Sequence, residues 1–104
     1  MKRLRRRGAY IDITSNPWIV KAADVAAGPL QIWPYKCLIT NIEFTQYAAP
    51  TDQAVVLQAN SKEFAFLQGA SDLEMVRTGD TRHADGILIP LAGITNGEIR
   101  IFHR

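Results

Sequence analysis

Asp80, His83 and Asp85 are residue types that bind divalent cations, and they fall within six positions of one another. The stretch 78–86 around them lacks large apolar side chains, which predicts a surface loop. Aspartate and glycine are also the residues that turns require. The pattern therefore has two interpretations, a metal site and a solvated loop or subunit contact, and it favours the second, so we expect no metal.

Nucleophilic chemistry would need Cys37 together with His83 or His103, the chain's two histidines. Cys37 lies inside the longest β-like run, residues 35–47, which favours a half-buried structural thiol. The chain has no glycine-rich phosphate loop, no paired-cysteine zinc spacing and no Gly-x-Ser-x-Gly elbow. We expect a protein that is not an enzyme and has no cofactor.

Trp18, Trp33 and Tyr35 form a candidate aromatic contact surface, and all three lie beside or close to a proline. Exposed rings of this kind stack on sugars or on nucleic-acid bases. The same residue types also fill the ends of small β-domains and are enriched at subunit interfaces. The structural interpretation is favoured over the binding surface.

A cationic arm begins the chain: five basic residues fall within six positions, namely Lys2, Arg3, Arg5, Arg6 and Arg7. Their mutual repulsion predicts a flexible segment over residues 1–8. The remaining chain has seven basic and ten acidic residues, a net charge of −3. Because this acidic body would repel phosphates, contact between the arm and a protein surface is favoured over nucleic-acid contact, and a merely solubilising tail is the third interpretation.

The elements that must position these residues are short strands. Alternating or β-branched runs separated by Gly, Pro, Asn and Ser recur about every ten residues, giving about eight strands. This predicts one all-β domain over residues 9–104, an antiparallel β-sandwich or jelly-roll with one core. The alanine-rich stretch 22–27 is read as one helical turn or a loop.

Within the run 35–47, Leu38, Ile42 and Phe44 share one parity and are expected to face the core. Ile39 belongs to the opposite parity. Asn60-Ser61 predicts a hairpin between the strands around Val55–Leu57 and Phe64–Leu67. A further hairpin from the run 35–47 into 54–58 would complete a three-stranded meander.

Cys37 is the chain's single cysteine, so no intrachain disulfide can form, and cytosolic synthesis is the simpler expectation. The residues after the arm lack the apolar run of a secretory signal. The longest apolar stretch, 87–94, is interrupted by a proline and a glycine, and it is far shorter than the roughly 20 residues that cross a bilayer. We expect no membrane span.

The pattern over residues 36–104 resembles small all-β structural proteins of tailed bacteriophage particles, which decorate heads or build neck and tail parts. The stretches behind this resemblance are Leu38 to Tyr47, Ala54 to Gln58, Asp72-Leu73, Gly86 to Leu91 and Gly97 to Phe102. The resemblance implies a non-enzymatic virion subunit, assembled in the host cytoplasm, present in many copies and in contact with other virion proteins.

Two functions are therefore expected in order. The first is a homo-oligomeric structural subunit that uses its sheet edges and its arm to bind neighbours. The alternative is a small β-module that binds a carbohydrate or a single-stranded nucleic acid through the aromatic residues.

Overall fold

The protein is all-β, as expected, apart from one helical turn. The computed structural model describes residues 3–6, 9–12, 15–25, 29–46, 53–69, 75–90, 93–94 and 96–104. Its elements are β1 (Arg3–Arg6), β2 (Ala9–Asp12), β3 (Trp18–Lys21), α1 (Ala22–Val25), β4 (Leu30–Thr45), β5 (Gln53–Leu57), β6 (Glu63–Gln68), β7 (Met75–Arg77), β8 (Arg82–Ile89) and β9 (Glu98–His103).

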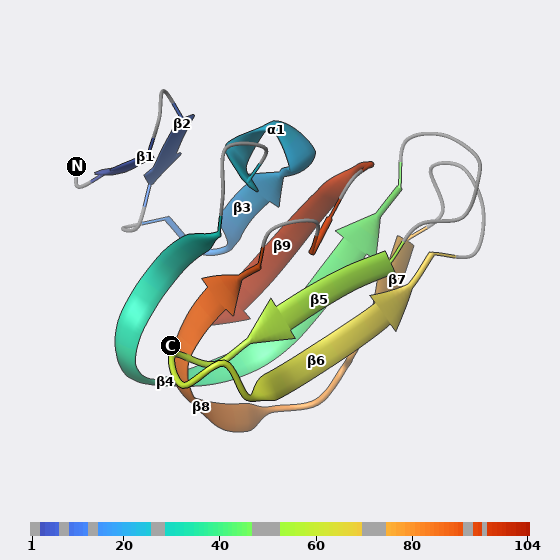
Figure 1. Cartoon of the computed structure of the whole chain (residues 1–104). Helices are drawn as coiled ribbons and strands as arrows, with labels where there is room; N and C mark the ends of the chain where they lie inside the picture. Colours follow the sequence, from blue (N-terminus) through green and yellow to red (C-terminus); the bar gives the residue numbers. More distant parts are fainter. Residues whose placement is uncertain are drawn as a thin grey trace.

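Seven of these strands form one antiparallel sheet in the order β3-β9-β4-β8-β5-β6, with β7 pairing β4 as well (Figure 1). The 16-residue strand β4 organises this sheet. Its first half pairs with β8, and its second half lies between β7 and β9. Strands distant in sequence therefore meet on β4, which makes most of the pairing long-range.

Strand β4 is strongly curved because its register shifts three times. Two shifts against β8 lie between Gln31 and Trp33 and between Trp33 and Lys36, and a third, against β9, lies between Ile39 and Asn41. Each inserts an extra residue on β4, and such bulges bend a strand and increase its twist. Pro34, which cannot donate to a ladder, falls in the second shift.

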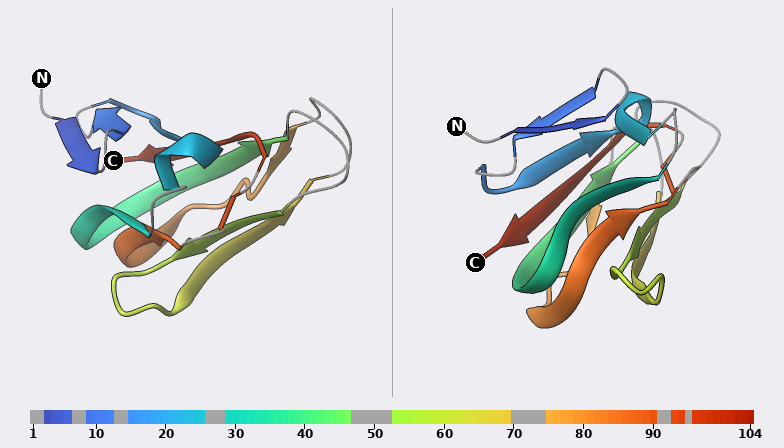
Figure 2. Two further views of the ribbon diagram at one scale, coloured as in Figure 1. Left: turned by 45° about the horizontal axis from the view of Figure 1, so that its top comes forward. Right: turned by 60° about the vertical axis from the view of Figure 1, so that its left-hand side comes forward.

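The curvature curls the sheet around one apolar core. Figure 2 shows the β5–β6 hairpin and the β3–β9 pair on opposite sides of the molecule. Their inward side chains nevertheless belong to one buried cluster, which includes Val20, Phe44, Val56, Leu67 and Ile101. The hydrogen-bonded strands of this body thus form a single curled sheet.

The predicted parity of β4 is confirmed in its second half and wrong in its first. Ile42 and Phe44 are buried, but Ile39 is buried as well, whereas Leu38 is only half-buried. The cause is the register shift next to Thr40: Ile42 pairs with Ile101, and Ile39 pairs with His103. Three steps along β4 therefore match two steps along β9. The inward side chains are odd-numbered just before the shift, at Ile39, and even-numbered after it, at Ile42 and Phe44.

The hairpin between β5 and β6 is confirmed, with Val55 opposite Phe66 and a turn closed by the Gln58 N–H donating to Lys62 O at 2.8 Å. The meander is wrong, because the register partners of β4 are β7, β8 and β9 rather than β5. Strand β8 intervenes between β4 and β5. Nothing in the local pattern signals that β8 occupies this place.

The surface loop predicted over 78–86 is also wrong from Arg82 onward, because β8 begins there. His83 and Asp85 lie on the exposed face of this strand, and Ala84 and Gly86 lie on its buried face. The inward residues are too small to produce a clear alternation of apolar and polar side chains, which is the usual mark of a half-buried strand.

The arm differs from the expected flexible segment at positions 3–6. There, β1 pairs antiparallel with β2, from Arg3 opposite Asp12 to Arg6 opposite Ala9. This register gives the cationic strand a backbone partner and places one acidic position beside it. Lys2 and Arg7 lie outside the described residues. The part of the chain that the structure describes contains no helix that is long and apolar enough to cross a membrane.

Candidate functional site

The three aromatic residues singled out by the sequence meet where β3 and the first half of β4 come together. The ring centroids of Trp18 and Trp33 are 6.0 Å apart with the planes inclined at 26°, and Tyr35 lies edge-on to Trp33 at 5.9 Å. Trp18 is 2% exposed and is part of the core, while Tyr35 is 69% exposed. The predicted contact surface thus consists of Trp33 and Tyr35, with Trp18 beneath them.

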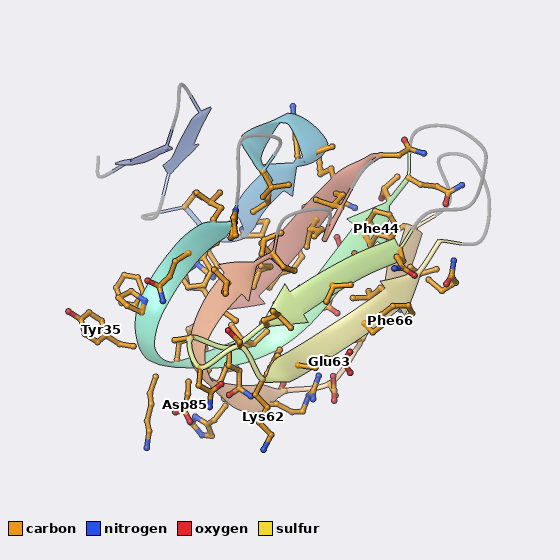
Figure 3. The ribbon with its side chains drawn as sticks, in the orientation of Figure 1. Tyr35, Phe44, Lys62, Glu63, Phe66 and Asp85 are labelled. Atoms are coloured by element: carbon orange, nitrogen blue, oxygen red, sulfur yellow. The ribbon has the colours of Figure 1, made fainter. Side chains whose placement is uncertain are left out.

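Tyr35 projects from the curved part of β4, away from the ribbon (Figure 3). It follows Pro34 within the register shift between Trp33 and Lys36. Bulges commonly turn a side chain out of the regular alternation. The local sequence therefore explains why an aromatic ring stands in solvent here.

His103 packs face to face on Trp18, with 3.7 Å between ring centroids and 16° between planes. Its Nε2 lies 2.8 Å from the carbonyl oxygen of Ser15. Because a carbonyl only accepts, Nε2 must carry the proton. The Asn16 side chain bonds both the N–H and the C=O of His103. The segment before β3 thereby fixes this ring.

A shallow pocket of about 160 Å³ opens beside this aromatic stack. Its walls come from β3, β4 and the end of β9 and comprise Trp18, Trp33, Lys36, Cys37, His103 and Arg104. The Arg104 N–H donates to Leu38 O at 3.0 Å, which holds the last residue against β4. Lys36 and Arg104 had no local sequence signal as site residues, because only long-range pairing brings them to the tryptophans. His103 was considered only as a partner of Cys37, and both residues line this pocket.

Cys37 is a free thiol in the wall of this pocket, and it is half-buried, as expected. Burial raises the pKa of Cys37 above its ordinary value, and the nearby Asp85 carboxylate raises this pKa further. A backbone hydrogen bond from Gly86 opposes both effects. The thiolate, which is the nucleophilic form, is therefore disfavoured.

We expect the rate of Cys37 alkylation to rise with pH around a higher midpoint in the folded chain than in the chain unfolded by denaturant. Below the pKa that Cys37 has in the unfolded chain, the thiol is neutral in both states. Between this pKa and the higher pKa of the folded chain, only the unfolded chain ionises, so the stability of the fold falls as pH rises through the folded pKa. Initial rates with iodoacetamide across the pH range measure both midpoints. Equal midpoints would show that burial does not disfavour the thiolate.

The acidic residues and His83 from the predicted loop are not assembled into a metal site. Asp80 is paired with Arg82 at 3.0 Å, and His83 and Asp85 lie opposite Leu38 and Lys36. Across the described part of the chain, no three His, Cys, Asp or Glu side chains are grouped so that they could hold a metal ion.

A charged cluster that the sequence did not single out lies on the outer face of β4 and β9. Arg100 donates from Nε to Glu43 Oε1 at 3.0 Å and from Nη2 to Thr45 Oγ1 at 2.8 Å, and it also pairs with Glu98. Burial lowers the pKa of Arg100, but the hydrogen bonds and charges of Glu98 and Glu43 outweigh burial and raise it. Both carboxylates thus serve to neutralise one guanidinium.

Comparison with known proteins adds no relative: no family model, no curated protein and no solved structure matches this chain. The features of this chain that bear on its function are therefore its sheet edges, its aromatic pocket and its charges.

Proposed function

We propose that this chain is a non-enzymatic structural subunit that assembles with other copies of itself, its curled sheet serving as a sandwich-like or jelly-roll body. The sequence resemblance supports a virion protein of a tailed bacteriophage, a head decoration, neck or tail component assembled in the host cytoplasm. The observation that carries the assembly step is the outer edge of β6, which is the last strand of the sheet among the described residues.

Strand β6 ends the sheet, so one side of its backbone faces away from β5. The Val55 N–H donates to Gly93 O at 2.8 Å, on the side of β5 opposite β6. Val55 and Phe66 therefore form a non-hydrogen-bonded pair, in which the backbone groups of both residues point away from each other. The N–H and C=O of Phe66 are thus directed outward from the edge.

Proteins usually protect such an edge with lysine, proline or a cover, because an exposed flat edge pairs with other chains. Strand β6 has neither lysine nor proline, and its one charged residue, Glu63, stands at its start. The Phe66 side chain is 49% exposed beside the edge. These features favour an edge that is paired in the assembled state.

A second copy of the chain satisfies the Phe66 backbone groups by symmetry. Antiparallel pairing of two β6 strands about a two-fold axis places Phe66 opposite the partner subunit's Phe66, so that each N–H donates to the other C=O. In this register Glu63 lies opposite the partner subunit's Gly69, and no like charges face each other. The cationic segment around β1 would then extend the contact to a neighbouring subunit.

We expect the purified chain to have a mass by light scattering that is a multiple of its 11.6 kDa at micromolar concentration. Phe66→Lys should reduce this mass to that of the monomer, because a lysine at the edge blocks strand addition while leaving the pairing with β5 intact. Ile19→Lys is the matched control: Ile19 is 41% exposed on β3, at the other end of the sheet, and its substitution should leave the mass unchanged.

Circular dichroism of both variants should match that of the unchanged chain, which separates lost assembly from lost folding. Removal of residues 1–7 should weaken assembly and leave the fold intact. A monomeric starting protein, or a Phe66→Lys variant with undiminished mass, would contradict the proposed β6 contact.

A further inference from the structure

The pocket beside Trp18 and Trp33 combines flat aromatic surface with positive charge, and the assembly role does not use it. Trp33 lines the pocket, and Tyr35 lies edge-on to Trp33 just outside the lining residues and is the most exposed large apolar-bodied side chain among the described residues. Lys36 and Arg104 lie in its wall, and none of the six lining side chains is acidic. This combination fits a ligand that is planar and anionic.

We propose that this pocket binds one nucleotide of a single-stranded nucleic acid, with its base stacked against the Trp33 ring, the exposed Tyr35 beside that base, and its phosphate beside Lys36 and Arg104. Aromatic side chains stack on bases of any sequence, and neighbouring cations track the backbone phosphates. The site is additional to the β6 edge, which lies at the other end of the sheet order.

The size of the pocket limits it to one ring system. Its volume of about 160 Å³ is below the roughly 300 Å³ at which sites for drug-sized ligands begin. A base that belongs to a flexible strand can enter from one side, while its neighbours remain outside. Paired bases in a duplex have no free face to offer, so the geometry selects single strands.

Charge distinguishes this ligand from a neutral sugar. Lys36 pairs in register with Asp85 on β8, which partly offsets its charge, and Arg104 adds a second cation from the end of β9. Sugar-binding sites also need precisely placed polar partners for the hydroxyl groups. The residues that line this pocket are cations and aromatic rings, apart from Cys37, and they do not provide such a set of polar partners.

His103 and Trp18 act as the rigid floor of this site. The Trp18 ring is stacked with both His103 and Trp33, and His103 is itself fixed by Ser15 and Asn16. A ring that is already held in place loses little freedom on binding. Tyr35, with most of its surface in solvent, is the ring that a ligand would order.

The test is quenching of tryptophan fluorescence in the full chain by an oligothymidylate of about ten nucleotides, at roughly 50 and 200 mM salt. We expect saturable quenching that weakens with salt. Tyr35→Ala should weaken binding about tenfold, and Tyr35→Phe, which keeps the ring, should bind as the unchanged chain does. Lys36→Gln should lower the slope of log affinity against log salt by about 0.7, the value for one phosphate on a single strand.

Phe66→Ala is the control for an exposed aromatic residue outside the pocket, and its affinity should be unchanged. The proposal is overturned if Tyr35→Ala binds normally, if replacing Arg3, Arg5 and Arg6 with Gln alone abolishes binding, or if a neutral glucan quenches independently of salt. If a mononucleotide binds with the same affinity as the oligothymidylate, the single-strand proposal is wrong and the site binds free nucleotides. Because the masses of the same variants report β6 pairing separately, either proposal can fail without the other.

Discussion

Replacing Gly97 with alanine is expected to destabilise the fold by about 3 kcal/mol or more. Gly97 has a φ of +113°, a conformation that costs an L-residue free energy before any contact is considered. A Cβ at this position would also collide with the carbonyl oxygen of Thr45 and would lie 2.8 Å from Gln46 Cα. Small domains are stable by only about 5–15 kcal/mol, so this loss is a large fraction of the total.

The colliding atoms cannot move aside cheaply. They belong to the backbone at the end of β4, where Thr45 pairs with Glu98 of β9. Gly97 also accepts a hydrogen bond from the Ala22 N–H at 3.4 Å. A shift large enough to admit a methyl group would therefore disturb β4, β9 and the start of α1 together. A close-packed interior has no free space that could absorb such a shift.

Gly79→Ala is the matched control for the backbone effect alone. Gly79 also has a positive φ, +71°, but no atom lies within 4 Å of the Cβ that alanine would add. Its expected cost is about 1 kcal/mol, the strain of the left-handed conformation. Urea unfolding of both variants, compared at constant m-value, measures the difference. Equal losses would mean that the collision at Gly97 is relieved and that only the φ angle matters.

The turn between β5 and β6 shows which features of the fold a sequence makes visible. Asn60-Ser61 is a turn signal, and it works because a turn depends on the backbone preferences of a few adjacent residues. The pairing of β4 with β8 and β9 depends on residues far apart in the chain, so it left no local mark. The same limit applied to β8, whose small inward residues concealed a strand.

The candidate site was predictable in one half only. Trp18, Trp33 and Tyr35 could be grouped because large aromatic residues beside prolines are conspicuous in a sequence of this size. The pocket that Trp18 and Trp33 share with His103 and Arg104 requires β9 to lie between β3 and β4, which no spacing along the chain implies. The cationic character of the pocket was therefore visible only once the strands were placed.

The second large effect concerns the register shift beside Thr40. Ile39→Ala is expected to cost about 3 kcal/mol, because Ile39 is 1% exposed and its truncation leaves a cavity in the core. Leu38→Ala removes a similar volume from a half-buried side chain and is expected to cost about 1 kcal/mol. Strict alternation from Phe44 and Ile42 predicts the reverse order, with Leu38 inside.

The two substitutions thus distinguish a bulged strand from a regular one. Leu38 and Ile39 are adjacent in one strand, so solvent conditions and the local backbone are nearly the same for both variants. What differs is the face of β4 that each side chain occupies, which follows from pairing Ile39 with His103 and Ile42 with Ile101. Urea midpoints for the pair measure the order directly. A larger loss for Leu38→Ala would place the inward face on even positions throughout β4, and His103 would then lose the register that brings it beside Trp18.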